Sequence, residues 1–272
     1  MNLWVLGSGS GGNAVLVETG TSRILVDAGF APRVLKQRLA TTGVAPESIE
    51  AVIVTHEHND HAKGVAAAAR KWGWKVVSTA GTRMMCPDWG DLDMILTPRQ
   101  SSIVVGGFQV DMFPVSHDAN EPVAVVLTSL ASGARAGVAY DLGYVTESLT
   151  RSMKHLDVLV LEANHDEGML RTGPYPPSVR NRIGGRLGHL SNRAAARLAS
   201  DSTHADLNNI VLAHLSESCN DARTALKTVG EELRRSRFRG RVTAAPQDAV
   251  VGPFVAGRGP GQSLPLQLGL GI

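Results

Sequence analysis

The feature that most constrains the fold is the segment Thr55-His56-Glu57-His58-Asn59-Asp60-His61. Three histidines and an aspartate lie within six positions, directly after the apolar run 51–54, whose β-branched composition and length are typical of a buried strand. We therefore expect these side chains on a loop at the end of that strand. Gly64 and the alanine-rich residues 65–70 predict that the loop leads into a helix.

This segment has the composition of a metal site. Histidine and carboxylate are the usual ligands of borderline divalent metals, and no cysteine lies nearby. The spacing lets His56 and His58 point one way while Asp60 and His61 turn the other way, so one loop could supply two adjacent metal pockets. The alternative is a polar loop whose histidines only cap a helix. We disfavour it because such clusters rarely follow a buried strand by chance.

The composition is that of a globular protein with one large domain or two small ones. The chain has 272 residues, 43% hydrophobic and 19% charged, and a net charge of +2 that argues neither for nor against nucleic acid. Cys86 and Cys219 lack a CxxC pattern, which favours reduced thiols in a cytosolic protein. Residues 1–7 do not resemble a signal peptide, and no apolar run approaches the roughly 20 residues that span a bilayer. We expect a soluble, cytoplasmic protein.

The first part of the chain reads as β structure. Residues 3–6 predict a strand, and 14–18 with 23–26 predict a hairpin. The glycine-rich loop 7–13 between them could cradle a phosphate. It lacks the GxxxxGKS pattern and precedes a strand, so a tight turn beside the site is favoured. Asp27, at the end of the third strand, is interpreted as a buried carboxylate that braces the histidine loop, with a distant metal ligand as the alternative.

Ligand-type residues also follow later strands. Strands are predicted at 75–78, 103–105, 108–114, 123–130, 135–139, 157–161 and 209–213. His117 and Asp141 each come after one of them, and with the first loop in hand they are interpreted as the missing ligands of a two-metal centre, with Asp141 bridging. Helices are predicted at 31–42, at 62–72, from Ser191 or Asn192 to about 200, and from Asp221 to about Arg235.

The predicted organisation is a single domain over residues 1–256. The Gly- and Pro-rich tail 257–272 is expected to be disordered or to form an arm against a neighbour. Nothing in the sequence indicates the oligomeric state.

Taken together, these residues resemble the pattern of a known family. The pattern HxHxDH at 56–61, followed by His117, Asp141 and His214, is similar to the metallo-β-lactamase fold, with Asp27 matching the first aspartate of that fold. The resemblance implies an α/β fold, a four-layered αββα sandwich with metals at the edge between the sheets. Within this superfamily the chain resembles the YycJ/WalJ-type proteins, described as 5′ DNA exonucleases, through the segments 7–13, 162–166, 173–176, 188–192 and 213–216.

The resemblance also assigns roles. It implies that His56, His58 and His117 hold one metal, that Asp60, His61 and His214 hold the other, and that Asp141 lies between them. Ribonuclease Z-type relatives carry Glu-Ala and Gly-His motifs that match Glu162-Ala163 and Gly188-His189, although Leu190 here precedes Ser191.

If the site holds two divalent ions, zinc or manganese, the following mechanism of phosphodiester hydrolysis is expected. Ions about 3.5–4 Å apart lower the pKa of a shared water, and the hydroxide attacks the phosphodiester in line. Asp60 can bind a metal and orient the nucleophile. His189 is the candidate acid for the leaving 3′ oxygen, with Glu162 orienting its ring. The alternative for His189 is that it only caps a helix. His165 has no clear role in the reaction, and a structural hydrogen bond is at least as good an interpretation as a catalytic one.

Two arginine clusters suggest a nucleic-acid partner. One surrounds His189 (Arg171, Arg180, Arg182, Arg186, Arg193), and the other surrounds Phe238, which could stack on a base (Arg234, Arg235, Arg237, Arg239, Arg241). The alternative for each is a solvated helix end, which for the second cluster is an equally good interpretation.

The favoured function is a metal-dependent 5′→3′ exonuclease on DNA, with RNA as an alternative substrate. A small-molecule hydrolase, such as a thioesterase or lactonase, is the runner-up; it would not need the arginines and would have a lipophilic pocket near the metals. A non-catalytic scaffold ranks last, because every expected ligand is present.

Overall fold

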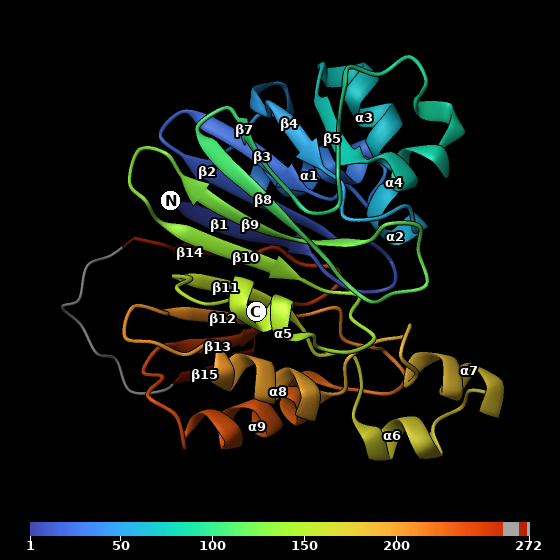
Figure 1. The fold of residues 1–272 in the computed structure, drawn as a ribbon, viewed down its shortest axis with the longest axis vertical. Coiled ribbons are helices and arrows are strands. Elements are labelled where there is room, and N and C mark those ends of the chain that lie inside the picture. The colour runs from blue at the N-terminus through green and yellow to red at the C-terminus, as the bar shows by residue number, and fades with distance from the viewer. Residues whose placement is uncertain (258–266, 271–272) are drawn as a thin grey trace.

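In the computed structural model, residues 1–257 and 267–270 are described. Two sheets lie face to face between outer helices (Figure 1). The first sheet has the order β14-β1-β2-β3-β4-β5-β6, with bounds Val251–Val255, Asn2–Gly7, Ala14–Thr19, Ser22–Val26, Ala51–Ile53, Lys75–Thr79 and Met94–Thr97. The second has the order β15-β13-β12-β11-β10-β9-β8-β7, with bounds Gln267–Leu270, Arg241–Ala244, Asn209–Ala213, Val158–Glu162, Arg135–Ala139, Val123–Ser129, Phe108–Pro114 and Ser101–Val105.

Alternate residues of the central strands face different cores. In β1, Leu3 and Val5 point into the core between the two sheets, while Trp4 and Leu6 pack on the opposite face. Because both faces are covered, the central strands are apolar nearly throughout rather than alternating.

The helices form the outer layers. They are α1 (Pro32–Thr41), α2 (Asn59–Ala62), α3 (Val65–Trp72), α4 (Ala80–Met84), α5 (Glu147–Ser152), α6 (Glu167–Thr172), α7 (Pro177–Ile183), α8 (Asn192–Asp201) and α9 (Ala222–Leu233), with short 3₁₀ turns at Pro46–Ser48 and Pro87–Trp89. Helices α1 and α3 cover the first sheet, and α5, α8 and α9 cover the second. The αββα sandwich predicted from the resemblance is confirmed.

Strand direction brings the predicted site residues to one edge. In the first sheet, β3 and β4 run parallel. In the second, β10, β11 and β12 are parallel, and β8 runs with them because both β8 and β10 are antiparallel to β9. The carboxyl ends of these strands therefore meet at the same edge of the sandwich, where ligand sites of such sheets are usually built.

The predicted histidine loop is shorter than expected. Asp60 and His61 lie in the one-turn helix α2, not on a loop, and the predicted helix 62–72 is divided at Gly64 into α2 and α3. The cause is a close backbone approach. The Gly64 amide donates to the Ala28 carbonyl at 2.9 Å, and a Cβ on Gly64 would lie 1.9 Å from the carbonyl oxygen of Phe30.

Two other segments differ from expectation. The Pro- and Arg-rich stretch after β11 contains α6 and α7, which stand apart from the α8–α9 layer at the lower right of Figure 1. Within the predicted tail, residues 267–270 form strand β15 beside β13 in place of a disordered segment or an arm, while 258–266 and 271–272 lie outside the described residues. Among the described residues, no helix is both long and apolar enough to cross a bilayer.

Candidate metal centre

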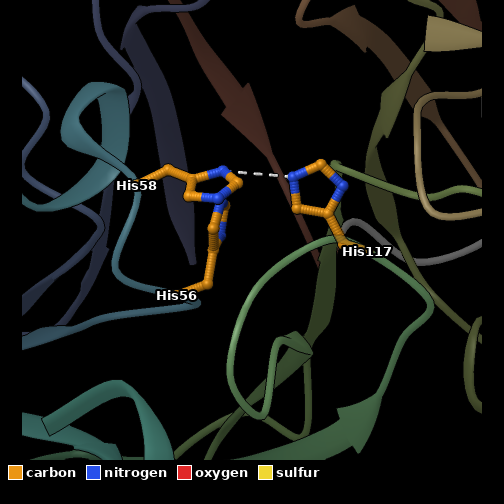
Figure 2. Close-up of side chains that lie close together, drawn as sticks. All are labelled: His56, His58 and His117. Carbon is orange, nitrogen blue, oxygen red and sulfur yellow. Dashed lines mark hydrogen bonds between the residues drawn. The ribbon is translucent and has the colours of Figure 1, made fainter. Parts of the chain in front are cut away.

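Three histidines predicted to share a metal lie together. We call His56, His58 and His117 the three-histidine group (Figure 2). His58 Nδ1 lies 3.2 Å from His117 Nε2, and His56 Nε2 is buried without a hydrogen-bond partner among the described residues. Each residue offers one nitrogen within 4.8 Å of the others.

The other nitrogen of each ring is held by the protein. His117 Nδ1 donates to the Gly188 carbonyl at 3.0 Å, and His58 Nε2 donates to the Asp118 carbonyl at 3.2 Å. His56 Nδ1 donates to Thr55 Oγ1 at 3.0 Å, because the Thr55 hydroxyl itself donates to Asp27. These outer bonds fix the rings with a lone pair facing inward, as metal-ligating histidines require.

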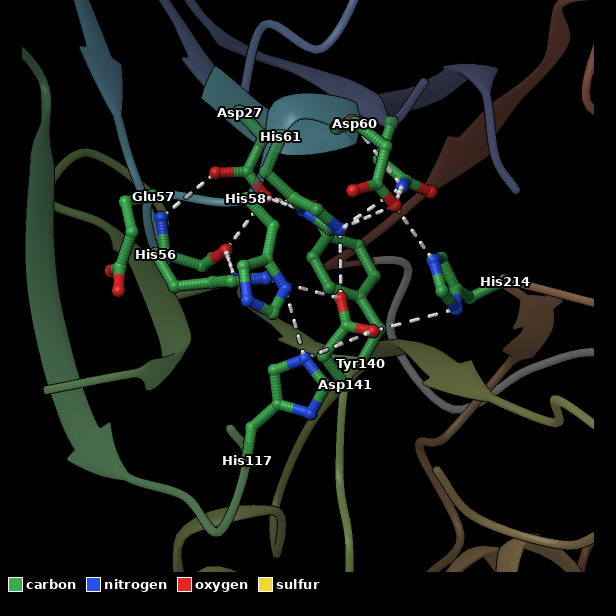
Figure 3. A network of polar contacts seen from close by, with 12 residues as sticks. Asp27, His56, Glu57, His58, Asp60, His61, His117, Tyr140, Asp141 and His214 are labelled. Atoms are coloured by element: carbon green, nitrogen blue, oxygen red, sulfur yellow. Dashed lines mark hydrogen bonds and ion pairs between the residues drawn. The ribbon is translucent and has the colours of Figure 1, made fainter. Parts of the chain in front are cut away.

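Three more of the predicted ligands form the Asp60 group: Asp60, His61 and His214. Asp60 Oδ2 lies 3.1 Å from His214 Nε2 and 3.4 Å from His61 Nε2. Asp141 lies between the two groups (Figure 3): its Oδ2 is 2.7 Å from His61 Nε2 and 3.8 Å from His56 Nε2. The structure therefore brings together all seven residues that the sequence predicted as ligands.

The donor set fits divalent cations. His58 Nδ1 and His117 Nε2 face each other with no hydrogen between them once their other nitrogens donate outward, and two such lone pairs repel unless a cation or proton intervenes. Likewise, His61 Nδ1 donates to Asp27, so Nε2 must carry either a proton or a metal where it meets Asp141. The buried Asp141 Oδ2 makes no well-aligned hydrogen bond among the described residues, so a cation would satisfy it.

The two groups differ in protonation. Burial lowers the pKa of His56 well below its ordinary value, and burial also lowers the pKa of His117. Burial opposes the charged form of His61 and His214 as well, but the neighbouring carboxylates outweigh it. Asp141 and Asp27 raise the pKa of His61 well above its ordinary value, and Asp141 with Asp60 raises that of His214 to about 9.

Asp27 braces the site as the sequence predicted. Its Oδ1 accepts from the Thr55 amide at 2.8 Å, and its Oδ2 accepts from the Thr55 hydroxyl at 2.8 Å and from His61 Nδ1 at 2.7 Å. The Tyr140 hydroxyl, at the end of β10 in the opposite sheet, donates to the same oxygen at 2.7 Å. Asp27 thus joins His61 to Tyr140 of the opposite sheet, on the side of His61 away from Asp141 (Figure 3).

Asp27, Asp141 and His214 share an uncommon backbone conformation. Their φ angles are 61°, 57° and 55°, in the left-handed region that non-glycine residues seldom adopt. Each residue directly follows a strand or comes two positions after one, so the chain turns sharply there and directs the side chain into the site. Such strain is frequent at functional sites.

His189 and Glu162 form the predicted pair. His189 Nδ1 lies 2.8 Å from Glu162 Oε1 and 3.1 Å from Asp141 Oδ1. Glu162 is fully buried, and its Oε2 accepts from the amides of Leu142 and Leu190. Burial lowers the pKa of His189, but Glu162 and Asp141 outweigh it and raise the pKa to about 10. His189 Nε2 has no hydrogen-bond partner among the described residues, and 22% of the side chain is exposed.

Several supporting residues were not foreseen in the sequence. Asn13, at the end of the glycine-rich loop, donates through Nδ2 to Asp60 Oδ2 at 3.4 Å and lies 3.1 Å from His61 Nε2. The loop itself makes the predicted tight turn, with the Gly12 amide donating to the Gly9 carbonyl. Glu57 accepts from the Asn120 amide at 2.7 Å and so tethers the loop that carries His117. Asn13 ends a segment that resembles the YycJ/WalJ-type proteins, and Glu57 lies within the HxHxDH pattern, but neither signal indicates these contacts.

The second arginine cluster does not belong to the site. Phe238 is fully buried in the core between the second sheet and its helices, so the prediction that it stacks on a base is wrong. In the parallel strands β12 and β13, Arg241 lies opposite Asn209 at the start of β12, whereas His214 follows the end of β12. The cluster therefore lies at the opposite edge of the sheet. Of the first cluster, Arg182 binds Asp118, and Arg186 lies over the ring of Tyr144.

Comparisons with known proteins agree with this geometry. A family profile described as "Beta-lactamase superfamily domain" matches residues 22–214. Exodeoxyribonuclease YycJ from Bacillus anthracis is 31% identical over 244 residues, which cover 86% of this chain and 89% of the relative. Exodeoxyribonuclease WalJ from Streptococcus pneumoniae serotype 2 (strain D39) is 30% identical over 238 residues, covering 85% and 88%.

Among solved structures, the metallo-β-lactamase fold protein YhfI from Bacillus subtilis is similar with a TM-score of 0.70 at 18% identity, covering 92% of this chain and 99% of that one. The sequence matches and the shared fold lead to one conclusion: this chain belongs to the beta-lactamase superfamily, as a metallo-β-lactamase-fold hydrolase similar to YycJ and WalJ.

Proposed function

We propose that this protein is a two-metal phosphodiesterase that degrades DNA from the 5′ end. The observation that carries the proposal is the Glu162–His189 pair, because it sets a proton donor beside the predicted metal ligands. His189 Nδ1 is 2.8 Å from Glu162 and 3.1 Å from Asp141, which leaves Nε2 free to face a substrate. The relatives named exodeoxyribonuclease support DNA as the substrate.

In this proposal, the three-histidine group holds one ion, the Asp60 group holds the other, and Asp141 lies between them. Two such ions, zinc or manganese, would supply an activated water and would neutralise charge on the phosphoryl oxygens. Asp60, which is partly exposed, orients the attacking water.

His189 acts at the other end of the reaction. As the P–O3′ bond breaks, His189 donates its Nε2 proton to the leaving 3′ oxygen, and Glu162 holds the ring and stabilises its charged form. The products are a released nucleotide with a 3′-hydroxyl and a strand that begins with a new 5′-phosphate.

A small-molecule hydrolase is the second candidate, because a specific observation favours it. A cavity of about 930 Å³ adjoins His189, and its wall includes the apolar residues Leu170, Leu190 and Leu198. A thioester or lactone could bind there. Turnover of such a compound without cleavage of nucleic acid would favour this candidate.

The test is cleavage of end-labelled DNA. Protein loaded with Mn²⁺ or Zn²⁺ is incubated with duplex DNA labelled at the 5′ or the 3′ end of one strand, and RNA of the same sequence is run in parallel. We expect progressive release from the 5′ end of DNA. A protein that leaves DNA intact with both ions would contradict the proposal.

Two variants control this assay. The double variant His58→Ala, Asp60→Ala removes a ligand from each group and reveals any contaminating nuclease. His155→Asn is the matched control, since His155 is an exposed histidine before the start of β11, at the edge opposite the site. Its φ of 59° is one that asparagine tolerates, so we expect unchanged cleavage.

We also propose a cytoplasmic location. Both cysteines are free and buried, which suits a reducing compartment.

A further inference from the structure

The cavity beside His189 has no role in the proposed cleavage of DNA. It lies between the loop before α5 and helices α6, α7 and α8, with a volume of about 930 Å³. This volume is within the range of pockets that enclose a small organic ligand. His189 forms part of its wall, so the cavity lies directly beside the proposed proton donor.

The charges around the cavity favour an anion. Three arginines line it, Arg171, Arg180 and Arg197, and none has a carboxylate partner within 4.0 Å among the described residues. Of the lining carboxylates, two are paired with arginines outside the wall: Glu147 with Arg151 and Glu167 with Arg193, each at 3.4 Å. Asp201 is the remaining carboxylate, so positive charge is in excess.

The cavity also offers an aromatic surface. Tyr144 lines it and is 39% exposed, which is high for a residue of this size. The Arg186 guanidinium lies 4.6 Å from the centre of the Tyr144 ring and holds it in place. An exposed ring of this kind can stack on a nucleobase, the role that the buried Phe238 cannot fill.

His165 adds a buried polar group whose hydrogen-bonding capacity is not satisfied within the described chain. It lines the cavity and is 3% exposed, and its Nδ1 has no hydrogen-bond partner among the described residues. A buried nitrogen without a partner is unfavourable, because it has lost its hydrogen bond to water. The nitrogen itself is covered, so a polar ligand would supply the missing partner only by shifting this wall.

From these observations we propose that the cavity binds the 5′-terminal nucleotide of the strand, with the base on Tyr144 and the 5′-phosphate on Arg171 and Arg180. This inference rests on the proposed function, because the 3′ oxygen that His189 protonates belongs to the nucleotide on the 5′ side of the cleaved bond. That nucleotide must lie on the His189 side of the metal groups, which is where the cavity is.

The chemistry makes such a site reusable. Water attacks phosphorus, the P–O3′ bond breaks, and the 3′ oxygen takes a proton from His189. The shortened strand therefore begins with a 5′-phosphate, the same group that the arginines bind.

The first experiment measures binding directly. Deoxyadenosine 5′-monophosphate and deoxyadenosine are titrated calorimetrically into the metal-loaded full chain. We expect the monophosphate to bind at least about tenfold more tightly, since charge-assisted bonds to phosphate are the strong ones. Arg171→Gln and Arg180→Gln should remove most of that difference. Tyr144→Ala should weaken the binding of both compounds about tenfold, by loss of stacking, and Tyr144→Phe should retain it.

The second experiment compares degradation of duplexes that carry a 5′-phosphate or a 5′-hydroxyl. The wild type should prefer the phosphate, and Arg171→Gln should lose the preference. Arg234→Gln, an exposed arginine of the far cluster, is the matched control and should keep it. Thermal melting of each variant excludes a folding defect.

The outcomes separate the two proposals. If DNA is degraded but the Tyr144 and Arg171 variants behave as wild type, the cavity proposal is overturned and the function stands. Monophosphate binding that disappears in His58→Ala, Asp60→Ala yet persists in the cavity variants places the phosphate on the metals and also overturns it. Binding that depends on Tyr144 and Arg171 in a protein that cleaves no DNA keeps the cavity and removes the proposed function.

Discussion

The three-histidine group and the Asp60 group lie side by side but are built differently. The three-histidine group contains no carboxylate, is held from outside by two backbone carbonyls and a hydroxyl, and includes His58, whose side chain is 31% exposed. The Asp60 group contains a carboxylate of its own, and His61 is backed by the buried Asp27. His56 and His117 of the first group are neutral, while the Asp60 group combines a carboxylate with two histidines that hold protons until a metal displaces them.

In the proposed two-metal site, this difference predicts the order in which the two groups bind metal. Carboxylates beside a buried histidine attract a doubly charged ion, and carboxylate support raises the basicity of the ligand. We therefore expect the Asp60 group to bind the first equivalent of metal. The three-histidine group should bind the second ion more weakly and exchange it more readily.

The largest effect is expected where the two groups meet. Asp141→Asn removes the negative charge between them, so we expect cleavage of DNA to fall by about 10³-fold, since a metal site supplies several kcal/mol of transition-state stabilisation. The measurement is kcat on end-labelled duplex, together with bound metal by elemental analysis. Asp206→Asn, at an exposed position, is the control. A variant that keeps both ions and full activity would show that Asp141 is not shared.

The second prediction compares matched substitutions in the two groups. His214→Asn should weaken the tighter class of metal sites, and His58→Asn should remove only the weaker class. We expect the dissociation constant of the first equivalent to rise about 100-fold in the former and to stay within about threefold in the latter. Competition with a chromophoric chelator measures both. The reverse assignment would mean that the three-histidine group fills first.

The third prediction concerns Asp27, which supports His61 on the side away from Asp141. Asp27→Asn keeps the size of the side chain but removes the charge that supports His61, so metal affinity at the Asp60 group should fall about 10- to 100-fold. Tyr140→Phe removes only the bond to Asp27 from the opposite sheet and should cost about 1 kcal/mol of unfolding free energy, with little change in affinity. Equal effects of the two variants on affinity would contradict a role for the Asp27 charge.

The fourth prediction is a difference in proton release. At pH 7 in the metal-free protein, His61 and His214 carry a proton, because their pKa values are raised, whereas His56 and His117 are neutral, because theirs are lowered. Loading the Asp60 group should therefore release up to about two protons and loading the other group almost none. Calorimetry in buffers of different ionisation enthalpy counts them. Similar release at both steps would contradict the assignment.

The smallest effect is on the pH dependence of stability. The pKa values of His214, about 9, and His189, about 10, lie above the roughly 6.5 of an unfolded chain. Their stabilising contribution is therefore complete below about pH 6.5 and is lost as pH rises through 9 and 10. Metal-free protein should melt at a lower temperature at pH 9.5 than at pH 6.5. Metal-loaded protein should change less, since ions replace the protons.

The candidate ligands that the sequence indicated are those that depend on local pattern. Residues 56–61 are conspicuous by themselves, His117 and Asp141 could be added because each follows a predicted strand, and His214 came from the resemblance to the metallo-β-lactamase fold. Helices such as α8 and α9 were anticipated from their caps, Ser191 and Asp221, whose side chains accept hydrogen bonds from the first turn.

What the sequence could not predict depends on tertiary contacts. In the sequence, Phe238 and its neighbouring arginines form one basic stretch with an aromatic residue. The packing of α9 on the sheet buries the ring and leaves the arginines exposed, and this packing cannot be inferred from the stretch itself. The break at Gly64 comes from a distant carbonyl, that of Phe30. Tyr144, beside the cavity, has no motif around it, and its exposure follows from where α6 and α7 stand.

The left-handed backbone at Asp27, Asp141 and His214 sets a rule for engineering this edge. An alanine at any of these positions would lose a side chain and also gain a backbone penalty of about 1–2 kcal/mol, so alanine scanning would exaggerate their chemical importance. Asparagine carries little of that penalty and isolates the missing ligand. For the same reason, a ligand set transplanted to an ordinary extended strand end would aim its side chains elsewhere. The curvature of the chain is as much a part of the metal centre as the histidines are.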